Sequence, residues 1–250
     1  MRSFLFIWTI GLFSPFAQAQ SSRFVSQTHS VPKTQETPQV SAGAGETLQL
    51  RCLPLWGEFP KTASQKREDE NFLKVCDENF GNRQEASQFF AERGWEYIAE
   101  GELDTACYRF NLAELLNSNN SEAYWGLGVI CHQRGQTPEA IRMLSKGVEI
   151  DTANSMLIDD LATLYIHQYK TSQQPADLDQ AFTLLDQSLR VDSTNATTFL
   201  KLSVAEFQRE NYEKAWKHLH HCRELDFQVL DIDYIEELKT KAADPLGFFK

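Results

Sequence analysis

Three histidines and a cysteine stand close together near the C-terminal end of the chain: His218, His220, His221 and Cys222. Imidazole and thiolate groups are zinc ligands, and His218 and Cys222 are one helical turn apart. Neighbouring residues on one helix point in different directions, however, so they cannot all reach one ion. We therefore expect Cys222 at a small buried position, the histidines on a solvated helix face, and neither a metal nor another cofactor.

Five cysteines are the other candidates for chemistry, and an odd number leaves at least one unpaired. Cys107 could bridge to Cys131, and Cys52 to Cys76, which would suit an oxidising compartment. Buried free thiols that fill small core sites are the alternative, and the spacings do not decide between the two.

The sequence carries no signature of an enzyme. It contains no GxSxG, HExxH, P-loop or dinucleotide-binding pattern. Acidic pairs such as Asp159 and Asp160 are interpreted as surface charges. A metal-dependent hydrolase would need a site at the histidine-rich helix or around His132, Asp159 and His167, and we keep it as an alternative hypothesis.

The elements that would position these residues come from a repeated pattern. Its clearest copy lies between residues 121 and 152, and it recurs once before and twice after. The central copy holds Tyr124, Leu127, Gly128, Cys131, Gly135, Ala140 and Leu144. The corresponding alanines, at positions 106, 140, 181 and 215, are 34, 41 and 34 residues apart. The third copy therefore has seven extra residues, which we expect to lengthen its first helix and loop and to make the edge protrude.

This skeleton resembles the tetratricopeptide repeat, a pair of antiparallel helices with the pattern aromatic-x2-Leu-Gly-x2-Tyr and then Ala-x3-Phe. The resemblance implies an all-α fold: a right-handed solenoid of about four helix-turn-helix repeats, with an extra N-terminal helix and a C-terminal capping helix. One repeat cannot bury its apolar face alone, so stacking must build the core. The repeats are expected at about 87–120, 121–154, 155–195 and 196–229, within a domain of residues 83–230. Glu206 departs from the expected tyrosine.

The flanks complete the domain plan. Residues 47–82 should hold an irregular apolar arm, packed on the first helices or acting as a binding hook, and one helix that starts at the capping-box pair Thr62 and Gln65. Residues 231–250 should hold the capping helix and a docked or frayed tail. The capping helix would turn Ile232, Ile235 and Leu238 inward.

The first residues of the chain have the features of a targeting signal. Residues 1–19 have one arginine, a short apolar run and Ala17-Gln18-Ala19 before Gln20, which predicts a cleavable signal peptide and a secreted or periplasmic protein. The alternative is an uncleaved membrane anchor, but the apolar run is shorter than the ~20 residues that a membrane span needs. Residues 20–46, rich in Ser, Thr, Gln and Pro, predict a disordered linker.

The resemblance also implies where a partner would bind, because the first helices of such repeats line a concave groove. The expected partner-binding residues are Trp95, Ile98, Trp125, Val129, His132, Gln133, Asp159, Ile166, His167, Leu200 and Phe207. The two tryptophans would be the anchors. Alternatively, the chain's own arm or tail covers this apolar surface.

These observations favour a protein-protein interaction scaffold that binds a peptide or protein segment in cell-envelope assembly. The net charge of −11 disfavours nucleic acid and an anionic membrane surface, and it suits a basic or apolar partner. A self-assembling structural protein is the main alternative, because a neighbouring copy could supply the arm or tail to the groove.

Overall fold

A computed structural model describes residues 50–249. This part of the chain is helical and contains no strand, so the predicted all-α fold is confirmed. The signal peptide and linker predicted for residues 1–46 lie outside the described residues. The helices are η1 (Pro54–Glu58), α2 (Ala63–Asn79), α3 (Arg83–Ala99), α4 (Leu103–Leu116), α5 (Ser121–Gln133), α6 (Thr137–Ile150), α7 (Ser155–Ser172), α8 (Pro175–Val191), α9 (Ala196–Gln208), α10 (Tyr212–Leu225), η2 (Phe227–Val229) and α11 (Ile232–Lys241).

The first helix of every repeat begins at an asparagine. The N-cap residues of α3, α5, α7 and α9 are Asn82, Asn120, Asn154 and Asn195. Each side chain accepts a hydrogen bond from a backbone N–H of the first turn, which would otherwise have no partner within the helix. These caps fix where each repeat starts.

A residue with positive φ lies in the turn between the two helices of every repeat. Gly101 and Gly135 hold this position in the first two repeats, with φ of 80° and 74°. Gln173 and Glu210 hold it in the last two, with φ of 53° and 61°. Glycine reaches this region without a Cβ clash, whereas other residues do so at a cost.

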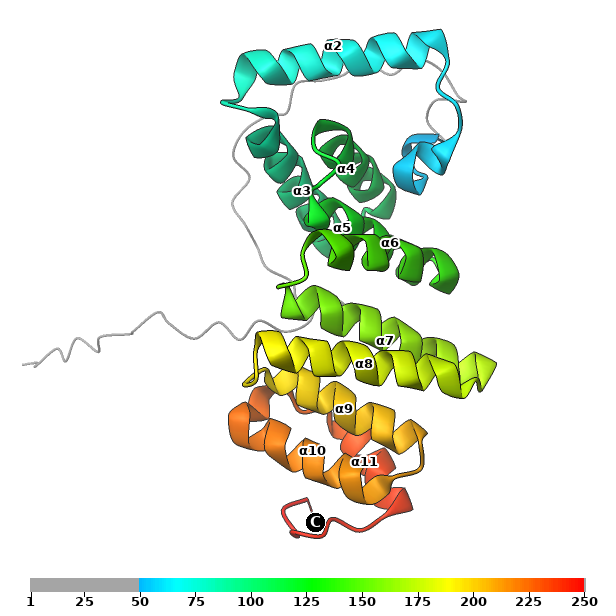
Figure 1. Ribbon diagram of the computed structural model, residues 1–250, viewed down its shortest axis with the longest axis vertical. Coiled ribbons are helices and arrows are strands. Elements are labelled where there is room, and N and C mark those ends of the chain that lie inside the picture. Colours follow the sequence, from blue (N-terminus) through cyan, green and yellow to red (C-terminus); the bar gives the residue numbers. More distant parts are fainter. Residues whose placement is uncertain (1–49, 250) are drawn as a thin grey trace, which may run out of the picture.

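The paired helices stack in series. Within the repeats α3 packs on α4, α5 on α6, α7 on α8 and α9 on α10, and Figure 1 shows the pairs following one another along the long axis. Small residues allow the paired helices to approach closely. A Cβ on Gly128 would lie 1.8 Å from Leu144 Cδ1, and one on Gly94 would lie 2.7 Å from the ring of Phe110.

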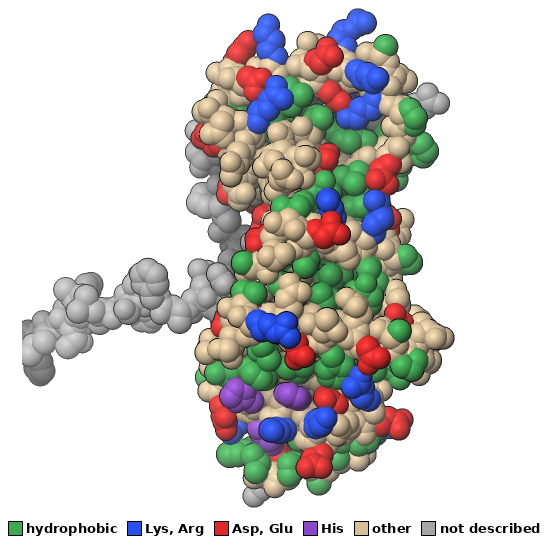
Figure 2. Space-filling view, in the orientation of Figure 1, with side chains coloured by type: hydrophobic (Ala, Val, Ile, Leu, Met, Phe, Trp, Pro, Cys, Tyr) green, Lys and Arg blue, Asp and Glu red, His purple; other side chains and the backbone are tan. Residues whose placement is uncertain are grey.

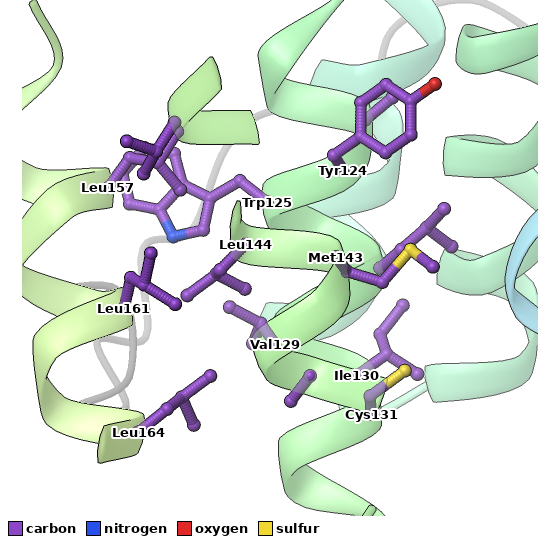
Figure 3. Close-up of a cluster of buried hydrophobic side chains, with 14 of the residues drawn as sticks. Tyr124, Trp125, Val129, Ile130, Cys131, Met143, Leu144, Leu157, Leu161 and Leu164 are labelled. Atoms are coloured by element: carbon purple, nitrogen blue, oxygen red, sulfur yellow. The ribbon is translucent and has the colours of Figure 1, made fainter. Parts of the chain in front are cut away.

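Stacking buries one apolar core from α2 to α9. Figure 3 shows its centre, where side chains of α5, α6 and α7 meet: Tyr124, Trp125, Val129, Ile130, Cys131, Met143, Leu144, Leu157, Leu161 and Leu164. A smaller cluster joins α9, α10 and α11 through Phe207, Trp216, Leu219, Tyr234, Ile235 and Leu238. The molecule therefore has a large central core and a second one at its C-terminal end.

The third repeat carries its extra residues in both helices. α7 has 18 residues and α8 has 17, against 13 and 14 in α5 and α6. The connecting turn is short, because only Gln173 and Gln174 separate α7 from α8. The predicted longer helix is confirmed, but the predicted longer loop is wrong. The tip of this repeat extends past α9 in Figure 1.

The arm lies on second helices of the repeats. Asn111 of α4 is fully buried; its amide donates to Leu53 O at 2.8 Å, and its Oδ1 accepts from Leu55 N at 2.8 Å. Arg142 of α6 donates twice to Glu58, at 3.1 and 2.9 Å. The following helix, α2, starts with the predicted capping box of Thr62 and Gln65. The described part of the arm is thus attached to α4 and α6.

The C-terminal helix α11 closes the stack. Ile235 and Leu238 face the core as predicted, but Ile232 is 65% exposed and Tyr234 is buried in its place. Ile232 is the first residue of α11, directly after the N-cap Asp231, which explains its exposure. No helix within residues 50–249 is both long and apolar enough to span a membrane.

Candidate functional site

The predicted binding residues lie on α3, α5, α7 and α9, and we call this set of helix surfaces the first-helix face. α3 contacts α5, and α7 contacts α9. Trp95, Ile98, His132 and Leu200 are half-buried on it, and Gln133 and His167 are exposed. The other five predicted residues are buried: Trp125, Val129, Asp159, Ile166 and Phe207.

Two tryptophans, Trp95 and Trp125, form an aromatic pair between the first two repeats. The rings of Trp95 and Trp125 are 5.4 Å apart in an edge-to-face arrangement, and Trp95 Nε1 donates to Glu122 at 2.6 Å. Trp125 has no exposed surface and donates through Nε1 to Asp160 at 2.9 Å. The expectation that both tryptophans anchor a partner is therefore corrected. Trp125 is part of the core, and of the two only Trp95 has solvent-exposed surface.

Asp160 links this tryptophan pair to the last repeat. One carboxylate oxygen accepts from Trp125, and the other lies 3.6 Å from Nζ of Lys201 on α9. Lys201 also donates to the hydroxyl of Thr163. A chain of side chains therefore runs from α5 through α7 to α9 and fixes how three consecutive first helices sit against one another.

Asp159 is the second carboxylate of this centre. It accepts hydrogen bonds from Thr198 at 2.8 Å and from Asn195 at 3.1 Å. Asp159 and Asp160 are 1% and 0% exposed, so their interpretation as surface charges is wrong. They are buried because their partners, Trp125, Thr198 and Lys201, come from neighbouring repeats, which single-sequence spacing does not reveal.

The electrostatics of the pair follow from this burial. Burial raises the pKa of Asp160 to about 7, although Lys201 and the hydrogen bond from Trp125 act in the opposite direction and the charge of Asp159 adds to the rise. Burial also raises the pKa of Asp159. One ammonium group thus faces two carboxyl groups, and burial favours the protonated form of both.

Two histidines meet across α5 and α7. The rings of His132 and His167 are 5.4 Å apart and nearly perpendicular. Burial, together with the charge of His167, lowers the pKa of His132. No group of three or more His, Cys, Asp or Glu side chains within residues 50–249 is placed to hold a metal ion. This part of the face therefore offers a pair of imidazole rings to a partner.

An open cleft of about 650 Å³ lies at one end of the first-helix face, and sequence reasoning missed it. Its walls are the turn between α7 and α8, the turn between α9 and α10, and α11. It is lined by Tyr169, Lys170, Gln173, Pro175, Leu178, Phe207, Gln208, Arg209, Glu210, Tyr212, Glu237 and Lys241. The lengthened third repeat builds one wall, so the 41-residue spacing was the signal that could have located it.

Phe207 belongs to this end of the molecule. Its ring contacts Tyr212 and Tyr234 edge to face, at 5.6 and 5.8 Å between centroids. It is 8% exposed and forms part of the C-terminal core. Arg209 covers the neighbouring wall, because its guanidinium lies 4.3 Å from the ring centroid of Phe182 and donates to Asp179 at 2.7 Å.

The histidine-rich segment of α10 divides into two environments. His218 and His221 both contact the ring of Phe199, and Figure 2 shows histidines gathered near the C-terminal end of the molecule. His220 is 5% exposed and lies 2.7 Å from Asp244 Oδ1. The expectation of a wholly solvated histidine face is therefore wrong at His220, because the C-terminal segment folds back over it.

Four cysteines are buried free thiols: Cys76, Cys107, Cys131 and Cys222. The bridges considered for them are absent from the described structure. Burial raises the pKa of Cys107, Cys131 and Cys222 to about 12. A thiol with so high a pKa is a poor nucleophile at neutral pH, and these residues fill core sites instead.

The paired helices, their stacking and the first-helix face define the tetratricopeptide repeat fold. The chain is similar to TTC0263, a TPR protein of Thermus thermophilus, with a TM-score of 0.56 over 63% of this chain and 84% of that one, at 20% identity. It is also similar to PilF of Pseudomonas aeruginosa, with a TM-score of 0.53 over 64% and 73% of the two chains, at 16% identity. No family model and no curated protein matches the sequence. At these identities the likeness concerns the fold.

Proposed function

We propose that this chain is a non-catalytic scaffold that holds a peptide or protein segment along the first-helix face and in the adjoining cleft. The observation that carries the proposal is the cleft itself. Its volume of about 650 Å³ suits a few side chains, and its lining combines aromatic rings, amides and charges of both signs. The network from Trp125 to Lys201 holds the helices beneath the face in fixed positions, which lowers the cost of ordering on binding.

The chemistry of the partner follows from the side chains of the first-helix face that stay accessible. Trp95, Ile98 and Leu200 offer half-buried apolar area, and Gln133 and His167 offer polar groups. The chain as a whole has a net charge of −11, which favours the approach of a basic partner. A segment with apolar side chains and a net positive charge fits both features.

Export is part of the proposal. The sequence of residues 1–19 supports a secretory signal and hence a role in cell-envelope assembly. The mass of the chain recovered from the periplasmic or extracellular fraction tests this, because cleavage after Ala19 would leave Gln20 as the first residue. A chain found only inside the cell and still carrying Met1 would contradict export.

Photo-crosslinking in living cells tests the binding site. A benzoyl-phenylalanine at Gln208, which lines the cleft, should capture one discrete partner, whereas the same group at exposed Lys146 on α6 should not. Reversing both Glu210 and Glu237 to Lys should reduce the Gln208 crosslink by about tenfold or more, since it leaves the lining with only basic charges, which repel a basic segment.

Glu149→Lys is the matched control, because it reverses an exposed glutamate on the outer helix α6. It should leave the crosslink unchanged. Equal capture from Gln208 and Lys146, or a Gln208 crosslink that survives the double reversal, would mean that the cleft does not hold the partner.

Self-assembly is a second candidate, favoured by apolar residues at the C-terminal end of the stack. Phe227 and Ile232 are 70% and 65% exposed, and Leu225 is exposed beside them in the sequence. Sedimentation over roughly a hundredfold range of concentration distinguishes the two candidates. A mass that rises with concentration, and falls again in Phe227→Ser, would favour a structural assembler.

A further inference from the structure

The last residues of the chain form a docked peptide on α10. The backbone carbonyl of Ala242 accepts from Trp216 Nε1 at 3.1 Å. The ring of Phe249 stacks on both Trp216 and His220, with interplanar angles of 22° and 17° and centroids 5.9 and 5.8 Å apart. Trp216, His220 and Phe249 thus make a three-ring stack, two rings from α10 and one from the tail.

Asp244 organises this peptide. Its carboxylate accepts from the backbone N–H groups of Leu246 and Phe249, both at 2.9 Å, and lies 2.7 Å from His220 Nε2. Burial raises the pKa of Asp244, but these backbone hydrogen bonds and His220 outweigh it and bring the pKa down to about 2. The carboxylate therefore stays charged and holds the tail both in its own turn and against α10.

The attachment is incomplete in two ways. Phe248 lies under the guanidinium of Arg223 at 3.7 Å, yet it stays 57% exposed, and Leu246 is 60% exposed. The side chain of His220 is buried, but its Nδ1 has no hydrogen-bond partner. The exposed side chains and the unbonded ring nitrogen leave the contact between the tail and α10 weaker than a fully satisfied one, which favours exchange.

The position of the peptide is also informative. In the earlier repeats the second helix packs on the next repeat, α4 on α5, α6 on α7 and α8 on α9. α10 has no further repeat after it within the described chain, and α11 and residues 242–249 cover it instead. Figure 1 shows this segment at the end of the stack, below α10. Removing the peptide would uncover Trp216 and His220.

We propose that Trp216, His220 and Arg223 form a docking site for a short segment of a partner protein with the chemistry Asp-x4-Phe and a second aromatic residue, and that residues 244–249 occupy it in cis as an exchangeable plug. The aspartate bonds His220, one ring joins the Trp216 stack, and the other meets Arg223. This site lies on α10, apart from the first-helix face, and does not rest on the function proposed above.

Exchange requires the partner to compete with a tethered ligand. A tether as short as Ala242 and Ala243 gives an effective concentration of about millimolar or above, so a free peptide should hardly bind the wild-type chain. A full-length variant that cannot plug its own site, Asp244→Ala with Phe249→Ala, should expose it while leaving α10 intact.

The test is fluorescence anisotropy with a labelled synthetic peptide of sequence AADPLGFFK, residues 242–250 of this chain. The released variant should bind it at least about tenfold more tightly than the wild type does. A peptide with Asn for Asp and Ala for the last Phe should bind at least about tenfold more weakly than the natural one. Adding His220→Gln to the released variant should abolish binding of the natural peptide.

Circular dichroism confirms that each variant keeps its helices, and the single variant Asp244→Asn provides a milder release if the double one loses structure. Equal peptide affinity in wild-type and released chains would overturn the proposal, and so would binding that is indifferent to His220→Gln. A wild-type chain whose mass rises with concentration in an Asp244-dependent manner would also overturn it, since the occupant would then be the tail of a second copy.

Discussion

Asp160 is the residue where the structure departs most from a simple apolar solenoid. It is fully buried at the junction of three repeats, and its pKa is raised to about 7 from 3.8, first of all by burial. The folded chain therefore keeps a proton between about pH 4 and pH 7 that the unfolded chain has lost. The stabilisation linked to this group is fully present below pH 3.8 and is lost as the pH rises through about 7.

Replacing Asp160 with Asn should remove this dependence. Between about pH 5 and pH 7 the free energy of unfolding of the wild type should fall relative to that of Asp160→Asn by about 1 kcal/mol per pH unit. The reason is that unfolding of the wild type releases the Asp160 proton in this range, whereas Asn has no proton to release. Urea unfolding at several pH values measures the difference. Asp186→Asn, an exposed change on α8, should run parallel to the wild type. A pH-independent gap between Asp160→Asn and the wild type would contradict the assignment.

Residue types and spacing predicted some of this site and missed the rest. Cys222 was placed correctly at a buried position, and the close approach at Gly128 follows from the repeat pattern. Asp159 and His220 were misjudged because their partners, Thr198 and Asp244, are 39 and 24 residues away. A carboxylate or an imidazole reads as exposed in a sequence until a distant partner makes its burial favourable.

At the scale of elements, the turns between paired helices differ between the first two repeats and the last two. All four turns need a left-handed residue, and only the first two use glycine. The two exceptions, Gln173 and Glu210, both line the cleft, where strained backbone would be tolerated if the side chains serve binding. Figure 2 shows charged side chains of both signs spread over the face in view.

Gln173→Gly and Glu210→Gly should therefore each stabilise the fold by up to about 1 kcal/mol, because glycine relieves the left-handed strain while its extra unfolded-state entropy offsets part of the gain. Thermal and urea unfolding measure it. Gly135→Ala is the reverse control and should destabilise, purely through its φ of 74°, since no heavy atom lies within 4 Å of the added Cβ. If the glycine variants weaken the fold, the side chains of Gln173 and Glu210 stabilise their turns by contacts that outweigh the strain.

Element boundaries were well predicted where local signals are strong. Thr62 with Gln65 marks the start of α2, and the alanine spacing located the lengthened third repeat. The division of the extra residues between α7 and α8 was missed, since spacing counts residues without saying which helix takes them. Pro175, the first residue of α8, is suited to that position and was the local signal that α8 begins early.

At the scale of the whole molecule, the four repeats form a linear array in which each packs on the next, so stability should vary along its length. The centre is tied together by the large core and by the chain from Trp125 through Asp160 to Lys201. The C-terminal end depends on a smaller cluster. Local opening should therefore begin at α10 and α11, where both proposed binding surfaces, the cleft and the tail site, have a wall.

Tyr234→Phe tests this gradient with the loss of a single oxygen atom. The Tyr234 hydroxyl is 2.7 Å from Ser203 Oγ in the C-terminal core, and Ser203 keeps its bond to Ala215 O, also at 2.7 Å, when the phenol is gone. The expected cost is about 1 kcal/mol. Hydrogen exchange measured by mass spectrometry should then speed up in α10 and α11 and stay unchanged in α5 and α6. Leu144→Ala, in the central core, should instead cost about 2–5 kcal/mol and speed exchange on both sides of α6. If Tyr234→Phe accelerates exchange equally in every helix, the described chain opens as one cooperative unit and the gradient is absent. A partner that binds at the cleft or the tail site would then stabilise the whole molecule rather than its C-terminal end.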